Sequence, residues 1–263
     1  MRTFLFKKMG LSQEDKKNPL CYSLASRTMV PYLLNSSPEG GRALDVGCGI
    51  GFLSNILTRK FAEVVGVDPD EGSLEKAKTI YRSPRLKFLR GRAENIPLPD
   101  DSVDFLVCST VLEHVDDLER TFQEMKRVCK PDSRFFIAVP PAEGIFGYFF
   151  LKIGHDESSQ YERDKRPPFT KKDVTELLFN NDFQIEKTFY SKIFLAEMFM
   201  GLTKIMHKLK KGGSCGSQSD ILMPPKIYQK LFPLILFLAK LEDFVLNDVL
   251  KGHVMIITEE IKK

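Results

Sequence analysis

Five short apolar runs alternate with longer amphipathic segments between residues 43 and 140, and this alternation restricts the possible folds more than any other feature of the sequence. The runs are ALDVGC (43–48), EVVGVD (63–68), LKFLRG (86–91), VDFLVCS (103–109) and RFFIAVP (134–140). Continuous apolar strands separated by helices are typical of a parallel sheet that is covered on both faces. The sequence therefore predicts an α/β fold, a Rossmann-like, doubly wound and mostly parallel seven-stranded sheet.

The pattern changes after residue 140. Thr170 and Asp173 form a capping-box-like start for a helix at 171–181, and strands are expected at 183–190 and 253–260. The segment 191–251 between these strands is far longer than a hairpin needs, so we interpret it as a helical insertion before the last strand.

Composition and charge exclude several classes of protein. The net charge of +4 is small and its signs are mixed along the chain, which argues against a nucleic-acid partner. The cysteines are odd in number and lack metal-ligand spacing, so we expect no metal site and a reducing, cytoplasmic location: Cys21, Cys48, Cys108, Cys129 and Cys215. The first residues do not resemble a signal peptide, and no run of about 20 apolar residues predicts a membrane-spanning helix.

A glycine-rich turn with an acid before it follows the first predicted strand. Gly47, Gly49 and Gly51 allow positive φ and the close approach of a ligand, while the free N–H groups at the helix start favour a negatively charged group. Such turns also occur in dinucleotide dehydrogenases and other nucleotide binders, and some bind nothing. Asp68, at the end of the second strand, could accept both hydroxyls of a ribose or simply cap the next helix.

Two details disfavour a nicotinamide dehydrogenase. The glycines follow GxGxG spacing instead of GxGxxG, and Asp45 would repel a pyrophosphate. A carboxylate there suits a ligand that carries an ammonium and a sulfonium, which indicates S-adenosylmethionine as the cofactor.

The runs LDVGCGIGFLS, VVGVDPD and GRAENIPLPDDSVDFLVCSTVLEHVDDLERTFQEMKRVCKPDSRFFIAVP resemble the class I S-adenosylmethionine-dependent methyltransferases. They are most similar to the small-molecule branch that includes quinone-biosynthesis enzymes. The resemblance covers residues 43–140 and implies three parts. An N-terminal helical segment at 1–42, helical at about 19–36, would lie over the cofactor. The core at 43–140 would bind the cofactor, and residues 141–263 would bind the acceptor.

The resemblance also implies roles for individual residues. Asp45 would hold the methionine end of the cofactor, Asp68 would bind the ribose, and Ser109 would present its carbonyl to the amino group. The remaining expected cofactor contacts come from the glycine turn and from the adenine side: Gly47, Cys48, Gly49, Gly51, Pro69, Ala93 and Glu94. Two positions depart from the family pattern, because Arg92 stands where many relatives have an aspartate and KPDS replaces KPGG at 130–133.

Three side chains are candidates for catalysis. Glu113 and His114 follow the fourth strand, and they either take part in catalysis or metal binding, as a similar pair does in some quinone-pathway relatives, or only order a helix start. His155, with Asp156 beside it, lies in the predicted loop after the fifth strand and could act as a base or be simply exposed.

The insertion indicates an apolar acceptor. Residues 192–211 and 225–251 each form an amphipathic pattern, the second bent or started near Pro233. The two helices could pack together over the acceptor pocket. A second interpretation adds peripheral contact of 191–251 with an anionic membrane, because residues 186–230 carry eight lysines and three acids.

We expect methyl transfer to a small, hydrophobic or lipid-like acceptor, at oxygen first and at carbon of a quinone-like ring second. A non-catalytic cofactor-binding scaffold is the remaining alternative, and the oligomeric state is open.

Overall fold

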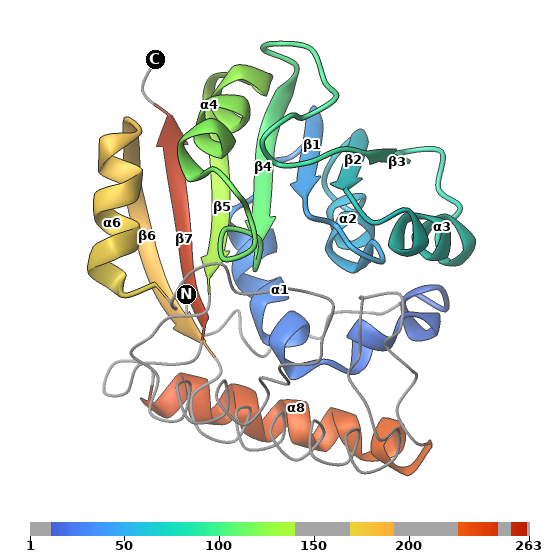
Figure 1. Ribbon diagram of the computed structural model, residues 1–263. Coiled ribbons are helices and arrows are strands. Elements are labelled where there is room, and N and C mark those ends of the chain that lie inside the picture. Colours follow the sequence, from blue (N-terminus) through green and yellow to red (C-terminus); the bar gives the residue numbers. More distant parts are fainter. Residues whose placement is uncertain (1–11, 140–168, 192–225, 247–253, 262–263) are drawn as a thin grey trace.

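The computed structural model describes residues 12–139, 169–191, 226–246 and 254–261, which form one sheet with helices on both faces (Figure 1). The strand order is β3-β2-β1-β4-β5-β7-β6. The five parallel strands are β1 (Arg42–Val46), β2 (Glu63–Asp68), β3 (Leu86–Arg90), β4 (Val103–Ser109) and β5 (Cys129–Val139). The antiparallel strands are β6 (Phe183–Ser191) and β7 (Val254–Ile261). The predicted Rossmann-like α/β fold with a largely parallel sheet is confirmed.

The order of the strands reverses between β1 and β4, which lie next to each other. In open α/β sheets the carboxyl edge at such a reversal is where ligands bind. In Figure 1 the carboxyl ends of β1, β4 and β5 point toward α1 (Leu24–Ser36). The fold thus directs the candidate site to the edge that α1 borders.

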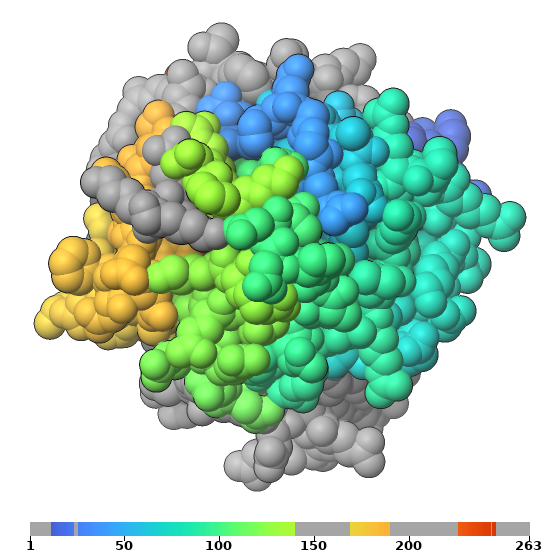
Figure 2. All heavy atoms as spheres, turned by 90° about the horizontal axis from the view of Figure 1, so that it is seen from above, coloured from blue at the N-terminus to red at the C-terminus, as the bar shows by residue number. Residues whose placement is uncertain are grey.

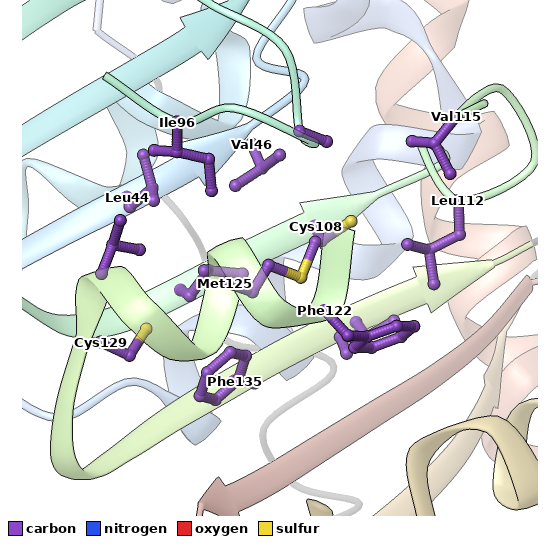
Figure 3. Packing of buried hydrophobic residues seen from close by; sticks show 14 of the residues in the cluster. Leu44, Val46, Ile96, Cys108, Leu112, Val115, Phe122, Met125, Cys129 and Phe135 are labelled. Carbon is purple, nitrogen blue, oxygen red and sulfur yellow. The ribbon is translucent and has the colours of Figure 1, made fainter. Parts of the chain in front are cut away.

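Two apolar layers hold the helices against the sheet. On one face, Phe122 and Met125 of α4 (Leu118–Val128) pack with Leu44, Cys108 and Phe135 of the strands (Figure 3). On the other face, the apolar side of α1 packs against the buried strand residues, in a cluster formed by Met29, Tyr32, Leu33, Val64, Phe105, Val107 and Phe136. The strands are apolar on both faces because helices cover both faces.

The helix starts carry the caps that the sequence indicates. Asp70 accepts hydrogen bonds from Gly72 N and Ser73 N at the start of α3 (Glu71–Ile80), and Asp117 accepts one from Arg120 N before α4. The predicted capping box of α6 (Lys171–Asn180) is confirmed, because Thr170 and Asp173 exchange hydrogen bonds of 2.8 and 3.1 Å.

The N-terminal segment is helical over the expected residues 19–36, with one interruption at Ser23. It consists of 3-10 turns η2 (Asp15–Lys17) and η3 (Pro19–Tyr22), followed by α1. Ser23 separates η3 from α1, and its extended backbone lets its hydroxyl accept a hydrogen bond from Ser26 N. The helical character expected at about 19–36 is therefore present as a 3-10 turn and an α-helix.

Between β6 and β7 the structure describes α8 (Lys226–Leu246). It continues through Pro233, so the predicted start near that residue is wrong. The ring of Phe232 meets Tyr22 edge-on at 5.6 Å, and the Tyr228 hydroxyl donates to the Tyr22 carbonyl at 3.3 Å, which seats α8 on η3 and α1. The other expected helix, at 192–211, lies outside the described residues. Across the part of the chain that the structure describes, no helix combines the length and apolar character that crossing a membrane requires.

Candidate functional site

The glycine turn joins β1 to α2 (Phe52–Leu57) through left-handed backbone at Gly47, Gly49 and Gly51, with φ of 68°, 51° and 77°. The N–H groups of Gly47 and Cys48 both donate to the Val67 carbonyl, at 2.7 and 3.0 Å. A Cβ on Gly47 would lie 2.3 Å from Cγ2 of Val111. Glycine is therefore required here by the fold itself, in addition to any need for a ligand to approach the main chain.

Asp68 links the end of β2 to this turn. Its Oδ2 accepts a hydrogen bond from Gly49 N at 2.8 Å, and its Oδ1 accepts one from Asp70 N at 2.9 Å. Each carboxylate oxygen has a second lone pair, which leaves acceptor capacity for two hydroxyl groups. Burial raises the pKa of Asp68 above its ordinary value. The adjacent Pro69 is exposed.

Asp45 is buried within β1, with only 2% of its surface exposed. The hydroxyl of Ser54, on α2, donates to its Oδ2 at 2.6 Å and fixes the orientation of the carboxyl group. Burial is the main cause that raises the pKa of Asp45 to about 7, and the charge of Asp68 adds to it. A positively charged ligand beside Asp45 would reverse this shift, so the carboxyl group is well suited to an ammonium or a sulfonium.

Arg27, on α1, is a candidate that the sequence analysis missed. It is 8% exposed, and neither Nε nor Nη1 has a hydrogen-bond partner among the described residues. Burial lowers the pKa of Arg27. The nearby Asp15 carboxylate already accepts hydrogen bonds from Asn55 and Arg59. A buried guanidinium with unused donors is costly unless an anion binds to it.

The packing of α1 places Arg27 toward the start of α2. Val30, one turn after Arg27 on the same face, packs in a cluster with Phe52 and Ile56. Phe52 directly follows Gly51, and Asn18 just before η3 donates from Nδ2 to the Ile50 carbonyl at 2.9 Å. A single arginine in an amphipathic helix is normally a surface residue, so the sequence gives no signal that distinguishes Arg27.

The loop after β3 carries the expected adenine contacts. Ala93 is buried, and Oε1 of Glu94 accepts a hydrogen bond from Asp116 N at 2.8 Å. Arg92 forms ion pairs with both Glu94 and Asp116. Arg92, which stands where many relatives have an aspartate, therefore has a structural role here. Its ion pairs join this loop to the segment before α4.

The candidates after β4 lie near α1. Ser109 ends β4, and its hydroxyl lies 3.5 Å from Sδ of Met29, while its carbonyl accepts a hydrogen bond from the Thr110 hydroxyl at 2.7 Å. Glu113 is buried and its Oε1 lies 4.0 Å from Nε2 of the partly exposed His114. The described residues contain no cluster of three or more side chains able to hold a metal ion. His155 lies outside the described residues.

The structure therefore brings the glycine turn, Asp45 and Asp68 together, with Ser109 at the end of the neighbouring strand and α1, which carries Arg27, packed against α2. A separate cleft of about 280 Å³ lies at the opposite edge, at the amino ends of β1 and β4, and is lined in part by Gly41, Asp104 and Ser133. Figure 2 views this opposite edge, where the chain from β1 to β5 lies beside α6 and β6. None of the predicted site residues lines that cleft.

The comparisons with known proteins agree with this geometry. Residues 44–137 match the family model described as a methyltransferase domain. The chain is 32% identical over 99 residues to the uncharacterised methyltransferase YcgJ of Bacillus subtilis, covering 36% of this chain and 39% of YcgJ. It is 33% identical over 131 residues to a probable S-adenosylmethionine-dependent methyltransferase of Mycolicibacterium smegmatis, covering 50% of this chain and 48% of the relative. The matches thus span less than half the length of these relatives.

The fold is shared over a longer stretch. A crystal structure of an S-adenosylmethionine-dependent methyltransferase from Thermotoga maritima superposes with a TM-score of 0.60 at 20% identity, covering 92% of this chain and 91% of that chain. The donor set in this structure also fits S-adenosylmethionine, since a buried acid lies beside the glycine turn and a buried guanidinium on the neighbouring helix has two nitrogen atoms without a partner among the described residues. Residues 44–137 are therefore a methyltransferase domain of the class I S-adenosylmethionine-dependent family, with S-adenosylmethionine as its cofactor.

Proposed function

We propose that this protein transfers a methyl group from S-adenosylmethionine to a small, hydrophobic or lipid-like acceptor, with oxygen as the first choice of acceptor atom. The observation that carries the proposal is the pair of opposite buried charges near the glycine turn. Asp45 favours a cation, and Arg27 has unused donors for an anion. A ligand with an amino acid end, a sulfonium and no phosphate complements both.

Each side chain has a defined task in this proposal. Asp68 accepts the ribose hydroxyls, while Asp45 and the Ser109 carbonyl hold the ammonium, directly or through water. Arg27 binds the carboxylate, and the adenine lies between Pro69 and the loop of Ala93 and Glu94. Gly47, Cys48, Gly49 and Gly51 form the main-chain cradle.

The cofactor supplies a methyl group on a sulfonium, and the protein holds the acceptor atom in the right position to receive it. Holding an acceptor atom in line with that methyl group contributes up to about 7 to 11 kcal/mol through proximity alone. A phenol or alcohol must also lose a proton, for which Glu113 with His114, or His155, are the proposed bases. Carbon methylation of a quinone-like ring is the second choice.

The aromatic contact between α8 and the N-terminal turns is consistent with an apolar acceptor. Tyr22, Tyr228 and Phe232 pack together where α8 meets η3, and Asn18 ties the start of η3 to the glycine turn. We therefore assign cofactor binding to residues 43–140 and acceptor binding to 141–263, with 1–42 covering the cofactor. We expect peripheral membrane contact within 191–251, and α8 is the described part of this segment.

The four described cysteines are free and buried, which supports a reducing, cytoplasmic location.

The function is tested by incubating the protein with methyl-labelled S-adenosylmethionine and separate lipid and aqueous cell extracts, followed by mass spectrometry. We expect one labelled product, in the lipid extract, that is absent with a cofactor-binding variant. A labelled product only in the aqueous extract would overturn the apolar acceptor. No labelled product in either extract, together with normal S-adenosylmethionine binding, would favour a non-catalytic scaffold.

The role of Arg27 is tested by removing part of the ligand. We expect Arg27→Gln to weaken S-adenosylmethionine binding by about 10-fold, the usual effect of losing one charge-assisted hydrogen bond. Binding of 5′-methylthioadenosine, which lacks the amino acid end, should not change. Calorimetry with both ligands measures this difference, and an equal loss for both ligands would show that Arg27 only stabilises α1.

A further inference from the structure

The outward side of α8 is apolar. Seven large hydrophobic side chains on this helix are between 39% and 70% exposed: Ile227, Leu231, Leu234, Phe237, Leu238, Leu241 and Val245. The opposite side is buried, through Phe232, Ile235, Leu236 and Ala239, and packs with Tyr22 and Tyr228. One face of α8 therefore holds the helix on the protein, while the other presents hydrophobic side chains outward.

These seven residues form a continuous stripe. Their spacing of three and four residues places them within about 120° around the helix axis. The 21 residues of α8 extend for roughly 32 Å, so the stripe is long as well as continuous. Proteins that remain free in solution rarely expose an apolar patch of this extent, and such patches mark protein or membrane contacts.

The exposed charges among the described residues of α8 are basic, while Lys240 and Glu242 are only partly exposed. Among the residues of α8 whose exposure the structure describes, the exposed charged side chains are Lys226 and Lys230. Lys230 lies within the arc of the stripe, where its long side chain can place the ammonium at a polar boundary while its methylene groups stay in apolar surroundings. Residues 186–230, which include both lysines, carry eight lysines and three acids. An anionic partner complements this surface, whereas two copies facing each other would bring like charges together.

We propose that the outward face of α8, defined by the seven residues above, docks on the surface of a membrane that contains anionic phospholipids. Amphipathic helices that combine an apolar face with basic residues lie in the plane of the membrane interface. Their apolar side inserts about 5 to 10 Å into the boundary between headgroups and acyl chains. Lys226 and Lys230 then face the lipid headgroups, where each lysine adds electrostatic attraction that salt weakens. This contact rests on the proposed function for its purpose, because α8 packs on η3 and α1, the elements that border the candidate site, and a lipid-like acceptor would come from the same membrane.

The test measures sedimentation of the full-length protein with vesicles of phosphatidylcholine alone or with 30% phosphatidylglycerol, at low and high salt. We expect binding to the anionic vesicles that weakens with salt, and a loss of at least about 10-fold in Leu234→Glu/Leu241→Glu. Phe179→Glu is the matched control, because Phe179 is 77% exposed but lies on α6, and it should bind as the wild type does. Lys226→Glu/Lys230→Glu should reduce the salt dependence.

Other outcomes overturn the proposal. Failure to bind anionic vesicles, or equal binding by the Leu234→Glu/Leu241→Glu variant, would reject it. A dimer in sedimentation velocity that the same variant converts to monomer, without vesicle binding, would assign the face to a second copy of this chain. S-adenosylmethionine binding, measured separately for each variant, reports on folding and on the proposed function. A wild-type protein that binds S-adenosylmethionine but not anionic vesicles would thus reject only the membrane contact.

Discussion

Replacing Asp68 with alanine is expected to weaken S-adenosylmethionine binding by at least about 100-fold. The carboxylate already holds the N–H groups of Gly49 and Asp70, and its remaining lone pairs are available to the ribose hydroxyls. Hydrogen bonds to a charged group contribute about 1.5 to 3 kcal/mol each, so the loss of two corresponds to a factor of 100 or more. Isothermal titration calorimetry measures the change directly.

The matched control is Asp70→Asn, two residues away. Asp70 caps α3 through Gly72 and Ser73, and asparagine preserves a cap while removing the charge. We expect this variant to bind the cofactor within about threefold of wild type. If Asp68→Ala bound S-adenosylmethionine as tightly as the control, the ribose role of Asp68 would be wrong, and its carboxylate would serve only the turn and the start of α3.

Replacing Asp45 with asparagine is expected to change affinity and stability in opposite directions. Near pH 8 the ionised Asp45 attracts the ammonium and sulfonium, so we expect Asp45→Asn to weaken S-adenosylmethionine binding by roughly 30- to 100-fold. With a pKa of about 7, wild-type Asp45 loses most of its charge by pH 6. Wild-type affinity should therefore fall about 10-fold from pH 8 to pH 6, while the variant shows a flat pH profile.

The stability effect has the opposite sign. The folded protein holds the Asp45 proton up to about pH 7, whereas the unfolded chain releases it near pH 3.8, so ionisation lowers the free energy of unfolding as pH rises between these values. Asp45→Asn removes this penalty, and we expect a more stable ligand-free protein at pH 8, by up to about 4 kcal/mol, with little change at pH 4. Urea unfolding at both pH values measures it. A variant less stable than wild type at pH 8 would show that the Ser54 hydrogen bond outweighs the buried charge.

The bounds of a strand or helix could be predicted from the sequence where its apolar residues form an uninterrupted run. Strands β2 and β4 agree with their predicted bounds at 63–68 and 103–109, because the apolar run of β2 ends in Glu63 and Asp68 and that of β4 is flanked by Ser102 and Thr110. β5 begins at Cys129 instead of Arg134, since Pro131 and Asp132 resemble a turn, and Asp132 indeed has left-handed backbone within the strand. The sequence pattern predicts that the helix after the glycine turn continues to about residue 61, but α2 ends at Leu57. At this end the Thr58 hydroxyl donates a hydrogen bond to the Asn55 carbonyl.

Some parts of the candidate site could also be predicted from the sequence, and others could not. The sequence places the glycine turn and Asp68 together because the carboxyl ends of adjacent parallel strands meet at one edge. It does not place Arg27, whose surroundings come from packing between α1, the N-terminal turns and α2. The contact of Glu94 with the main chain of Asp116 also depends on two loops far apart in the sequence. Such contacts follow from the three-dimensional arrangement and leave no periodic signal.

The pairing of β6 with β7 has a consequence for how new specificities can arise. Ser191 and Val254 are cross-strand neighbours in this antiparallel ladder, although 62 residues separate them in the chain. The sheet therefore fixes where the intervening segment leaves and returns, but not its length or composition, and lengthening such a segment has only a small entropic cost. Under the proposed function, exchange of residues 192–253 as one cassette would change the acceptor or the membrane contact, while the paired strands on either side stay as they are.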